Sequence, residues 1–329
     1  MLDEVVMNNQ SAQRSSIALV VLYYGTLPNY FNLTLATIRQ NPSINWVIIG
    51  DVVPPSELPQ NINFIHIPLN ELSQRFSSLG LGCATISSPY DICSMQPAIG
   101  AVFHDYLSSY DYWGHSDLDL LYGDLRHFLP EDVLKSHDRV YCRGHLSIYR
   151  NEERVNSAFQ LQTPDTTTFA NVLKNPSNQQ FDEWKGIHRI MRYHGFHQYH
   201  KEVIADIRPS RRYRIDRFET TELPNYENQL FYWYNGKTYR AYLHPEGGIY
   251  DEEVAYIHFQ KRSFPAPDHK LLVSGGFGIG PSGFFPYNRE PLTPDQFSEL
   301  NSGKWKSIPE ISREFIGRIH RKLKSVNHF

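Results

Sequence analysis

Three apolar runs in the first fifth of the chain predict buried strands. Residues 17–23 are continuously apolar and largely β-branched, and residues 46–51 and 63–67 have a similar character. Continuous apolar runs are typical of strands that are covered on both faces. Residues 30–39 and 69–76 lie after the first and third runs and carry apolar positions at helical spacing. This alternation predicts a parallel α/β sheet with right-handed crossovers.

The pattern becomes less regular later in the chain. Residues 97–110 begin with a proline, which suits a first helical turn, and residues 181–193 also predict a helix. Asn235 and Gly236 separate two apolar runs and predict a tight hairpin turn. Residues 264–303 are rich in Gly and Pro and predict loops.

The two ends of the chain differ from its centre. We expect a flexible N-terminus over residues 1–15, one mixed α/β domain over 16–300 and a basic amphipathic helical tail over 301–329. The first segment lacks the apolar stretch of a signal peptide. The tail fits two interpretations. It could lie on an anionic membrane surface, or it could pack on the domain with a solvated basic face.

Composition narrows the class of protein. The 329 residues include 32 Lys and Arg against 35 Asp and Glu, a net charge of −3, and 40% are hydrophobic. This excludes a disordered chain and argues against nucleic acid as a partner. The longest apolar run, residues 17–24, is far shorter than the ~20 residues of a spanning helix. Three cysteines without a C-x-x-C pair indicate a reducing compartment, so we expect a cytoplasmic protein that could work at the inner face of the membrane.

Asp117 and Asp119 are the central candidates for chemistry. Two carboxylates two residues apart on an extended segment point the same way. Mg²⁺ and Mn²⁺ take carboxylate oxygens together with phosphate oxygens, so a cation held here could neutralise a leaving diphosphate. The pair follows a short apolar strand, and ligands of such sheets bind beyond the carboxyl ends of the strands. The alternative is a solvated loop of acids.

Residues 89–125 resemble a bacterial family of glycosyltransferases found among capsular, exopolysaccharide and O-antigen biosynthesis proteins. The most specific block is WGHSDLDLLYGD at residues 113–124. YGTLPNYF at residues 24–31 and IHFQKR at residues 257–262 agree with it. The resemblance implies a GT-A-like, Rossmann-type mixed sheet flanked by helices. It also implies a nucleotide-sugar donor and Mn²⁺ or Mg²⁺ at the D-x-D pair.

The same resemblance implies a role for the late motif. In GT-A enzymes like these, a late histidine completes the metal shell, which here would be His258, and imidazole is an acceptable ligand. Lys261 and Arg262 would then lie near the same phosphates, where positive charge stabilises a leaving diphosphate. Without the resemblance, these residues are an ordinary histidine at a strand end and a solvated basic pair.

Five further residues complete the predicted site. Tyr24, Gly25 and Asp51 lie at the ends of the first two predicted strands, where they would frame the nucleotide. Asp182 or Glu183 could take the proton from an acceptor hydroxyl in an inverting transfer. The other interpretation is that these two acids begin a helix, where negative charge is favoured.

A group of side chains near residue 190 allows two further interpretations. Trp184 could stack on a sugar ring. A dense set of histidines follows, and because no cysteine accompanies it in sequence, a zinc site has little support. The set is His188, His194, His197 and His200.

The predicted function is a hexosyltransferase-type glycosyltransferase of surface polysaccharide biosynthesis. It would move a sugar from a nucleotide-diphosphate donor, expected to be a UDP-sugar, to a hydroxyl of a glycan that is free or lipid-linked. One alternative is a metal-dependent nucleotidyltransferase or nucleotide-diphosphate hydrolase. Another is a non-catalytic glycan-binding protein.

Overall fold

The computed structural model describes residues 14–177, 179–207, 215, 223–260, 264–268, 270–273, 275–280 and 283–300. Two predicted phosphate contacts, Lys261 and Arg262, lie outside the described residues. The tail at 301–329 and all but the last two residues of the 1–15 segment also lie outside them. The expectations placed on these residues stay predictions.

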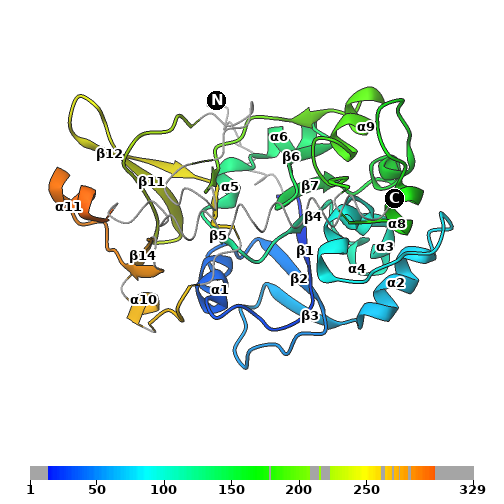
Figure 1. Ribbon diagram of the computed structural model, residues 1–329, viewed down its shortest axis with the longest axis horizontal. Coiled ribbons are helices and arrows are strands. Elements are labelled where there is room, and N and C mark those ends of the chain that lie inside the picture. The colour runs from blue at the N-terminus through cyan, green and yellow to red at the C-terminus, as the bar shows by residue number, and fades with distance from the viewer. Residues whose placement is uncertain are drawn as a thin grey trace, which may run out of the picture.

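A seven-stranded mixed sheet forms the larger half of the molecule (Figure 1). β1 pairs in parallel with β2 on one side and β4 on the other, and β4 pairs antiparallel with β7. This arrangement confirms the predicted Rossmann-type mixed sheet. In spatial order the strands are β3 (Ile62–His66), β2 (Ile44–Gly50), β1 (Ile17–Tyr23), β4 (Tyr112–Ser116), β7 (Leu146–Arg150), β6 (Arg139–Arg143) and β8 (Gln198–Tyr199).

Helices cover both faces of this sheet, which explains the continuous apolar runs. Along β1, Ala18 and Val20 belong to one buried cluster and Leu19 and Val21 to another. The second cluster includes α1 (Phe31–Arg39), α5 (Leu125–Phe128) and α6 (Glu131–Ser136). The first includes α2 (Leu69–Ser77), the 3-10 helix η1 (Pro89–Ala98), α3 (Ile99–Val102), α4 (His104–Leu107), α7 (Glu153–Asn156), η2 (Ala158–Gln160), α8 (Phe169–Lys174) and α9 (Ile187–Tyr193).

Two predicted helices differ from the structure. The 97–110 helix is wrong as a single element: η1 already covers Pro97, and Phe103 separates α3 from α4 with φ −117° and ψ 30°, outside the helical region. The 181–193 helix begins only at Ile187, because Gly186 has φ −118° and ψ −109°. Residues 181–186 form turns instead.

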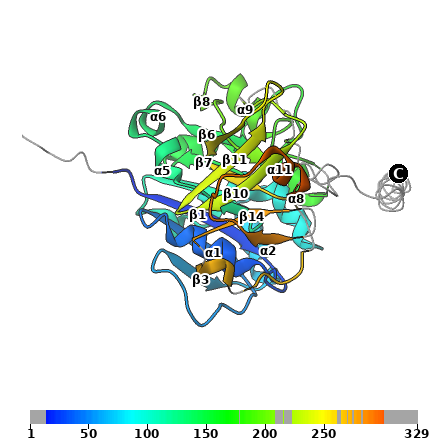
Figure 2. The same cartoon turned by 90° about the vertical axis from the view of Figure 1, so that its left-hand side faces the viewer.

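An antiparallel sheet of five strands forms the other half of the molecule, at the left of Figure 1, and faces the viewer in Figure 2. Its hairpin turn confirms the prediction, since Asn235 and Gly236 have φ of 46° and 82°, as a type I′ turn requires. The prediction of loops over 264–303 is wrong in part, because two strands and two helices lie there. The elements are β12 (Ile249–Val254), β11 (Lys237–Leu243), β10 (Gln229–Tyr234), β14 (Gly276–Ile279) and β15 (Phe284–Pro286), with α10 (Lys270–Val273) and α11 (Pro294–Leu300).

The glycines that suggested a loop belong to β14 for a packing reason. A Cβ on Gly278 would lie 2.3 Å from the ring of Phe285, and one on Gly276 would lie 2.4 Å from the carbonyl oxygen of Tyr287. The bare backbone therefore lets an aromatic side chain from β15 lie across the strand.

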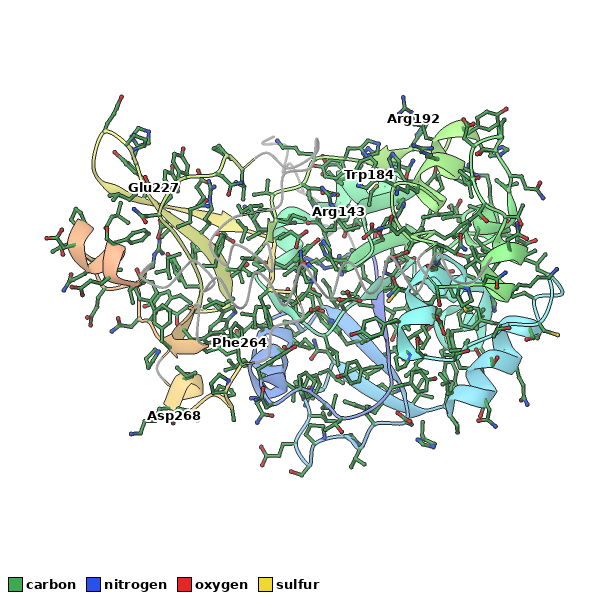
Figure 3. All side chains as sticks on the ribbon, in the orientation of Figure 1. Arg143, Trp184, Arg192, Glu227, Phe264 and Asp268 are labelled. Atoms are coloured by element: carbon green, nitrogen blue, oxygen red, sulfur yellow. The ribbon has the colours of Figure 1, made fainter. Side chains whose placement is uncertain are left out.

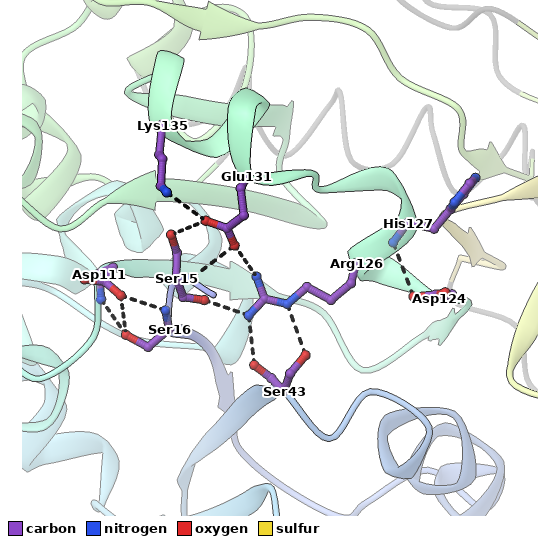
Figure 4. A network of polar contacts seen from close by, with 9 residues as sticks. All are labelled: Ser15, Ser16, Ser43, Asp111, Asp124, Arg126, His127, Glu131 and Lys135. Atoms are coloured by element: carbon purple, nitrogen blue, oxygen red, sulfur yellow. Dashed lines mark hydrogen bonds and ion pairs between the residues drawn. The ribbon is translucent and has the colours of Figure 1, made fainter. Parts of the chain in front are cut away.

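A polar network fixes the start of β1 against α5 and α6 (Figure 4). The Arg126 guanidinium donates to the carbonyl oxygens of Ser15 (2.7 Å) and Ser43 (2.9 Å). Ser15 Oγ donates to Glu131 at 2.7 Å, and Ser16 N donates to Asp111 at 2.7 Å. These bonds hold the first parallel strand in register before the chain enters the core.

Gly100 permits close contact between α3 and β4. A Cβ at this position would lie 2.3 Å from Nε1 of Trp113, whose N–H donates to Asn156 Oδ1 at 2.7 Å. We expect Gly100→Ala to lower the free energy of unfolding by about 1–3 kcal/mol through overpacking, measured by urea denaturation. Ala101→Ser, at the neighbouring and less buried position, is the control and should change it less. An unaltered midpoint in Gly100→Ala would contradict this packing.

Candidate active site

A small three-stranded sheet brings together residues that are far apart in sequence. It consists of β5 (Leu120–Tyr122), β13 (Tyr256–His258) and β9 (Ala205–Asp206). His258 lies opposite Leu120 on one side and Asp206 on the other. Phe259 N donates to the carbonyl oxygen of Asp119 at 3.2 Å. The late motif therefore lies directly against the D-x-D segment.

Asp117, Asp119 and His258 form one cluster of potential metal ligands. One ligand atom from each lies within 4.8 Å of the others. His258 Nε2 is 3.4 Å from Asp119 Oδ1. The histidine is buried and the two aspartates are half-buried. Two carboxylates and one imidazole, partly open to solvent, suit a divalent cation such as Mn²⁺.

Asp206 fixes the orientation of His258. The His258 ring shares a hydrogen bond of 2.8 Å between Nδ1 and Asp206 Oδ1, and Gln260 Nε2 donates to the same oxygen at 2.5 Å. Burial lowers the pKa of His258, but the Asp119 and Asp206 carboxylates outweigh burial and raise it to about 10. A carboxylate on Nδ1 directs Nε2 toward the aspartates, as in carboxylate–histidine–metal sites.

His145 completes the buried side of this cluster. Its ring stacks on His258 with centroids 4.2 Å apart, and Tyr256 Oη lies 3.3 Å from its Nδ1. His145 Nε2 is 3.8 Å from Asp206 Oδ2. Burial, and then the neighbouring positive charge of His258, lower the pKa of His145 to about 3. A neutral His145 therefore packs beside a charged histidine–aspartate pair.

The structure brings together two of the three residues that were predicted to contact the nucleotide. Gly25 N donates to Asp51 Oδ1 at 3.0 Å, and the φ of 106° at Gly25 needs a glycine. Both residues are exposed beyond the ends of β1 and β2. Tyr24 is buried instead, and its hydroxyl donates to the carbonyl oxygen of Ile67 at 2.9 Å. Burial, and then the Asp119 carboxylate, raise the pKa of Tyr23, which indicates that the D-x-D lies near this sheet edge.

Asp182 and Glu183 lie against Gly144, next to the histidines. A Cβ on Gly144 would be 2.4 Å from Asp182 Oδ2 and 2.9 Å from Glu183 Oε1, so both carboxylates lie close against the backbone of Gly144. Burial, the Glu183 charge and Asp117 raise the pKa of Asp182 to about 8. Burial also raises the pKa of Glu183, whose carboxylate interacts with Asp206 and His258.

Trp184 lies next to Arg143 and packs against charged and aromatic side chains (Figure 3). The Arg143 guanidinium lies over its ring at 5.6 Å from the centroid, and the His188 ring lies 4.0 Å away. Arg143 is itself paired with Glu202 at 2.6 Å, with both side chains buried. These contacts occupy much of the indole that was predicted to stack on a sugar.

The sequence prediction missed Asp206 and did not place His145 in the metal cluster. Asp206 directly follows the apolar residues 203–205, the same signal that singled out Asp51. His145 follows residues 139–142, which predict a strand, and could line an acceptor pocket or be a packed histidine, but the sequence holds no sign of its stacking on His258. Both depend on the register of β13 against β9 and β5.

Residues 19–288 match the model of DUF6625, a family of unknown function. The chain belongs to this family. No curated protein matches the chain in sequence. The match gives no activity, so the resemblance to capsular glycosyltransferases stays a prediction.

Similar solved structures include two of LgtC. One is described as an active-site mutant, and the other as a galactosyltransferase in complex with donor and acceptor sugar analogs. They are 12% and 11% identical to this chain, each covering 90% of it and 99% of their own length, with a TM-score of 0.36. Among the described residues, no helix has the length and apolarity to cross a membrane.

Proposed function

We propose that this protein is a metal-dependent glycosyltransferase of GT-A-like fold that transfers a sugar from a UDP-sugar to a glycan hydroxyl. The observation that carries the proposal is the convergence of Asp117, Asp119 and His258 at the carboxyl end of β4, which pairs in parallel with β1. Ligands of open α/β sheets bind at that edge. We include in this proposal that the transferred sugar is a hexose and that the reaction belongs to surface polysaccharide synthesis. The acceptor would be a lipid-linked glycan, and the tail at 301–329 would face the membrane.

The donor set favours Mn²⁺ or Mg²⁺ bound by Asp117, Asp119 and His258. A bound cation supplies positive charge where the diphosphate leaves. Asp206 accepts the hydrogen bond of His258 Nδ1, so Nε2 would be the ligand atom, and its own proton would pass to solvent when the cation binds. Gly25 and Asp51 would contact the nucleoside, and Lys261 and Arg262 the phosphates.

Glu183 is the proposed base for the acceptor hydroxyl, and the neighbouring Asp182 stays protonated. Two carboxylates that share one site ionise in sequence, so the one with the higher pKa keeps its proton. Asp182 is the more buried of the two, and its pKa of about 8 keeps it largely protonated at pH 7. Glu183 is less buried and interacts with His258, so its ionised form can take the proton of an acceptor hydroxyl.

Asp206→Asn tests the positioning of His258. The amide still reaches Nδ1 but no longer supplies the negative charge that orients and polarises the ring. We expect Mn²⁺ affinity to fall about 10–100-fold, measured by isothermal titration calorimetry, with the far-UV spectrum preserved. Asp105→Asn, on the exposed side of α4, is the matched control. An affinity equal to that of the unmodified protein would remove Asp206 from this role.

The products of donor turnover test the proposed function. The protein is incubated with Mn²⁺, a panel of UDP-sugars and a glycan acceptor, and the released nucleotide is identified by ion-exchange chromatography. Glycosyl transfer releases UDP and lengthens the acceptor. Release of pyrophosphate in a parallel incubation with UTP and a sugar 1-phosphate would instead indicate a nucleotidyltransferase, and release of UMP with a sugar phosphate from the UDP-sugar would indicate a diphosphate hydrolase. Binding without turnover would favour a glycan-binding protein.

A further inference from the structure

A second cluster of metal-binding side chains lies around β6 and β8, at one edge of the seven-stranded sheet. It consists of Cys142 from β6, His188 from α9 and His200, which directly follows β8. One ligand atom from each lies within 4.8 Å of the others. Cys142 Sγ is 3.8 Å from His200 Nδ1, and the two imidazole rings meet edge to face with centroids 5.1 Å apart.

The distances suit a common metal ion. Zn–S bonds of about 2.3 Å and Zn–N bonds of about 2.0–2.1 Å at tetrahedral angles place sulfur and nitrogen about 3.6 Å apart. The observed separation of Cys142 Sγ and His200 Nδ1 is 3.8 Å. Gln198 Oε1 is a further oxygen donor, 3.7 Å from the same sulfur.

The environment of His188 is a second, independent indication. Its side chain is only 3% exposed, and its Nδ1 is buried without a hydrogen-bond partner among the described residues. Burying an unpaired polar group costs free energy unless another interaction compensates. A metal ion bound through Nδ1 would supply that interaction.

We propose that Cys142, His188 and His200 bind one Zn²⁺ ion, at a site separate from the aspartate cluster. A thiolate and two imidazoles form a soft donor set that suits zinc, whereas the carboxylates of Asp117 and Asp119 suit Mn²⁺ or Mg²⁺. On binding, the Cys142 S–H bond breaks, its proton passes to solvent and the sulfur electron pair forms the Zn–S bond. The ion connects β6, α9 and the segment after β8.

The buried charges around the cysteine are partly paired with one another. Glu202 Oε1 accepts a hydrogen bond from Cys142 N at 3.1 Å, and the same carboxylate pairs with Arg143. Arg139 and Arg192 add positive charge near His188. The thiolate therefore balances one of the two charges of the ion, while Glu202 is shared with Arg143.

Cobalt substitution of the full-length protein tests this proposal. The purified protein is treated with a chelator and titrated with Co²⁺, whose thiolate complexes absorb by sulfur-to-metal charge transfer in the near ultraviolet. We expect one such chromophore per chain, displaced by Zn²⁺. Cys142→Ser should abolish the band, and Cys83→Ser, at an exposed cysteine, should keep it.

Two more variants keep the test decisive if Cys142→Ser folds poorly. His200→Gln changes an exposed side chain and should weaken Co²⁺ binding and alter the band. Asp119→Asn should leave the band unchanged, which separates this site from the aspartate cluster. Absence of a charge-transfer band in the folded, unmodified protein would overturn the proposal. So would its persistence in folded Cys142→Ser.

Discussion

Asp119→Asn is expected to lower the Mn²⁺-dependent release of UDP from the donor by about 10³-fold or more. The substitution removes one of the two carboxylates and the charge that lies 3.4 Å from His258 Nε2. The lost cation binding corresponds to several kcal/mol of transition-state stabilisation, and each 1.4 kcal/mol is a factor of ten in rate. Released UDP is measured at saturating donor over a range of Mn²⁺ concentrations.

Asp124→Asn is the matched control for this variant. Asp124 belongs to the same sequence block, but its side chain accepts a hydrogen bond from His127 N at the start of α5. Asparagine caps helices as well as aspartate, so folding and turnover should change little. Comparable turnover in Asp119→Asn and Asp124→Asn would contradict the assignment of the metal site.

Glu183→Gln is expected to lower turnover by about 10²–10⁴-fold while donor binding persists. Glutamine keeps the size of the side chain but cannot accept a proton. Because burial raises the pKa of Glu183, the rate of the unmodified protein should fall on acidification at a pH above the ordinary carboxyl range. The measurement is kcat and KM for the donor between pH 5 and 9, with binding followed separately by calorimetry.

Asp182→Asn distinguishes the two carboxylates. At pH 7 the asparagine resembles the protonated Asp182, so its effect on kcat should be smaller than that of Glu183→Gln. A raised pKa in the folded state stabilises the protein at acidic pH, and this contribution is lost as the pH rises from about 4 to 8. Asp182→Asn should therefore melt at a higher temperature than the unmodified protein above pH 8. A larger loss of kcat in Asp182→Asn than in Glu183→Gln would reverse the two roles.

Local pattern was sufficient to predict the three parallel strands β1, β2 and β3, but not the antiparallel pairing of β7 with β4 and β6 that makes the sheet mixed. The strands at 17–23, 46–51 and 63–67 and the hairpin at Asn235 agree with the structure because continuous apolar runs and an Asn-Gly turn are local signals. The helix at 97–110 was wrong because η1 already covers Pro97 and the backbone leaves the helical region at Phe103, which the spacing of apolar residues does not show. The strand β14 was missed because its glycines are explained only by the rings that pack on them.

The candidate sites show the same limit. Asp117 and Asp119 are recognisable in sequence because they are two residues apart, whereas the pairing that brings Asp206 to His258 involves a strand of only two residues. Cys142 lies where the register of β6 against β7 shifts between Val140 and Arg143, and Tyr141 has a φ of 58°. In a regular strand, successive side chains point to opposite faces of the sheet, and this irregularity interrupts that alternation. The sequence therefore could not place Cys142 beside the histidines.

Thermal melting of the purified full-length protein with UDP, GDP, CDP or CMP, each with and without Mn²⁺, tests the central claim most directly. A ligand at 100 times its dissociation constant stabilises the folded state by about 2.7 kcal/mol, which raises the melting temperature measurably. The proposed site predicts a rise with UDP that requires Mn²⁺ and is lost in Asp119→Asn. An equal rise without Mn²⁺, or no rise with any nucleotide up to millimolar concentrations, would contradict it.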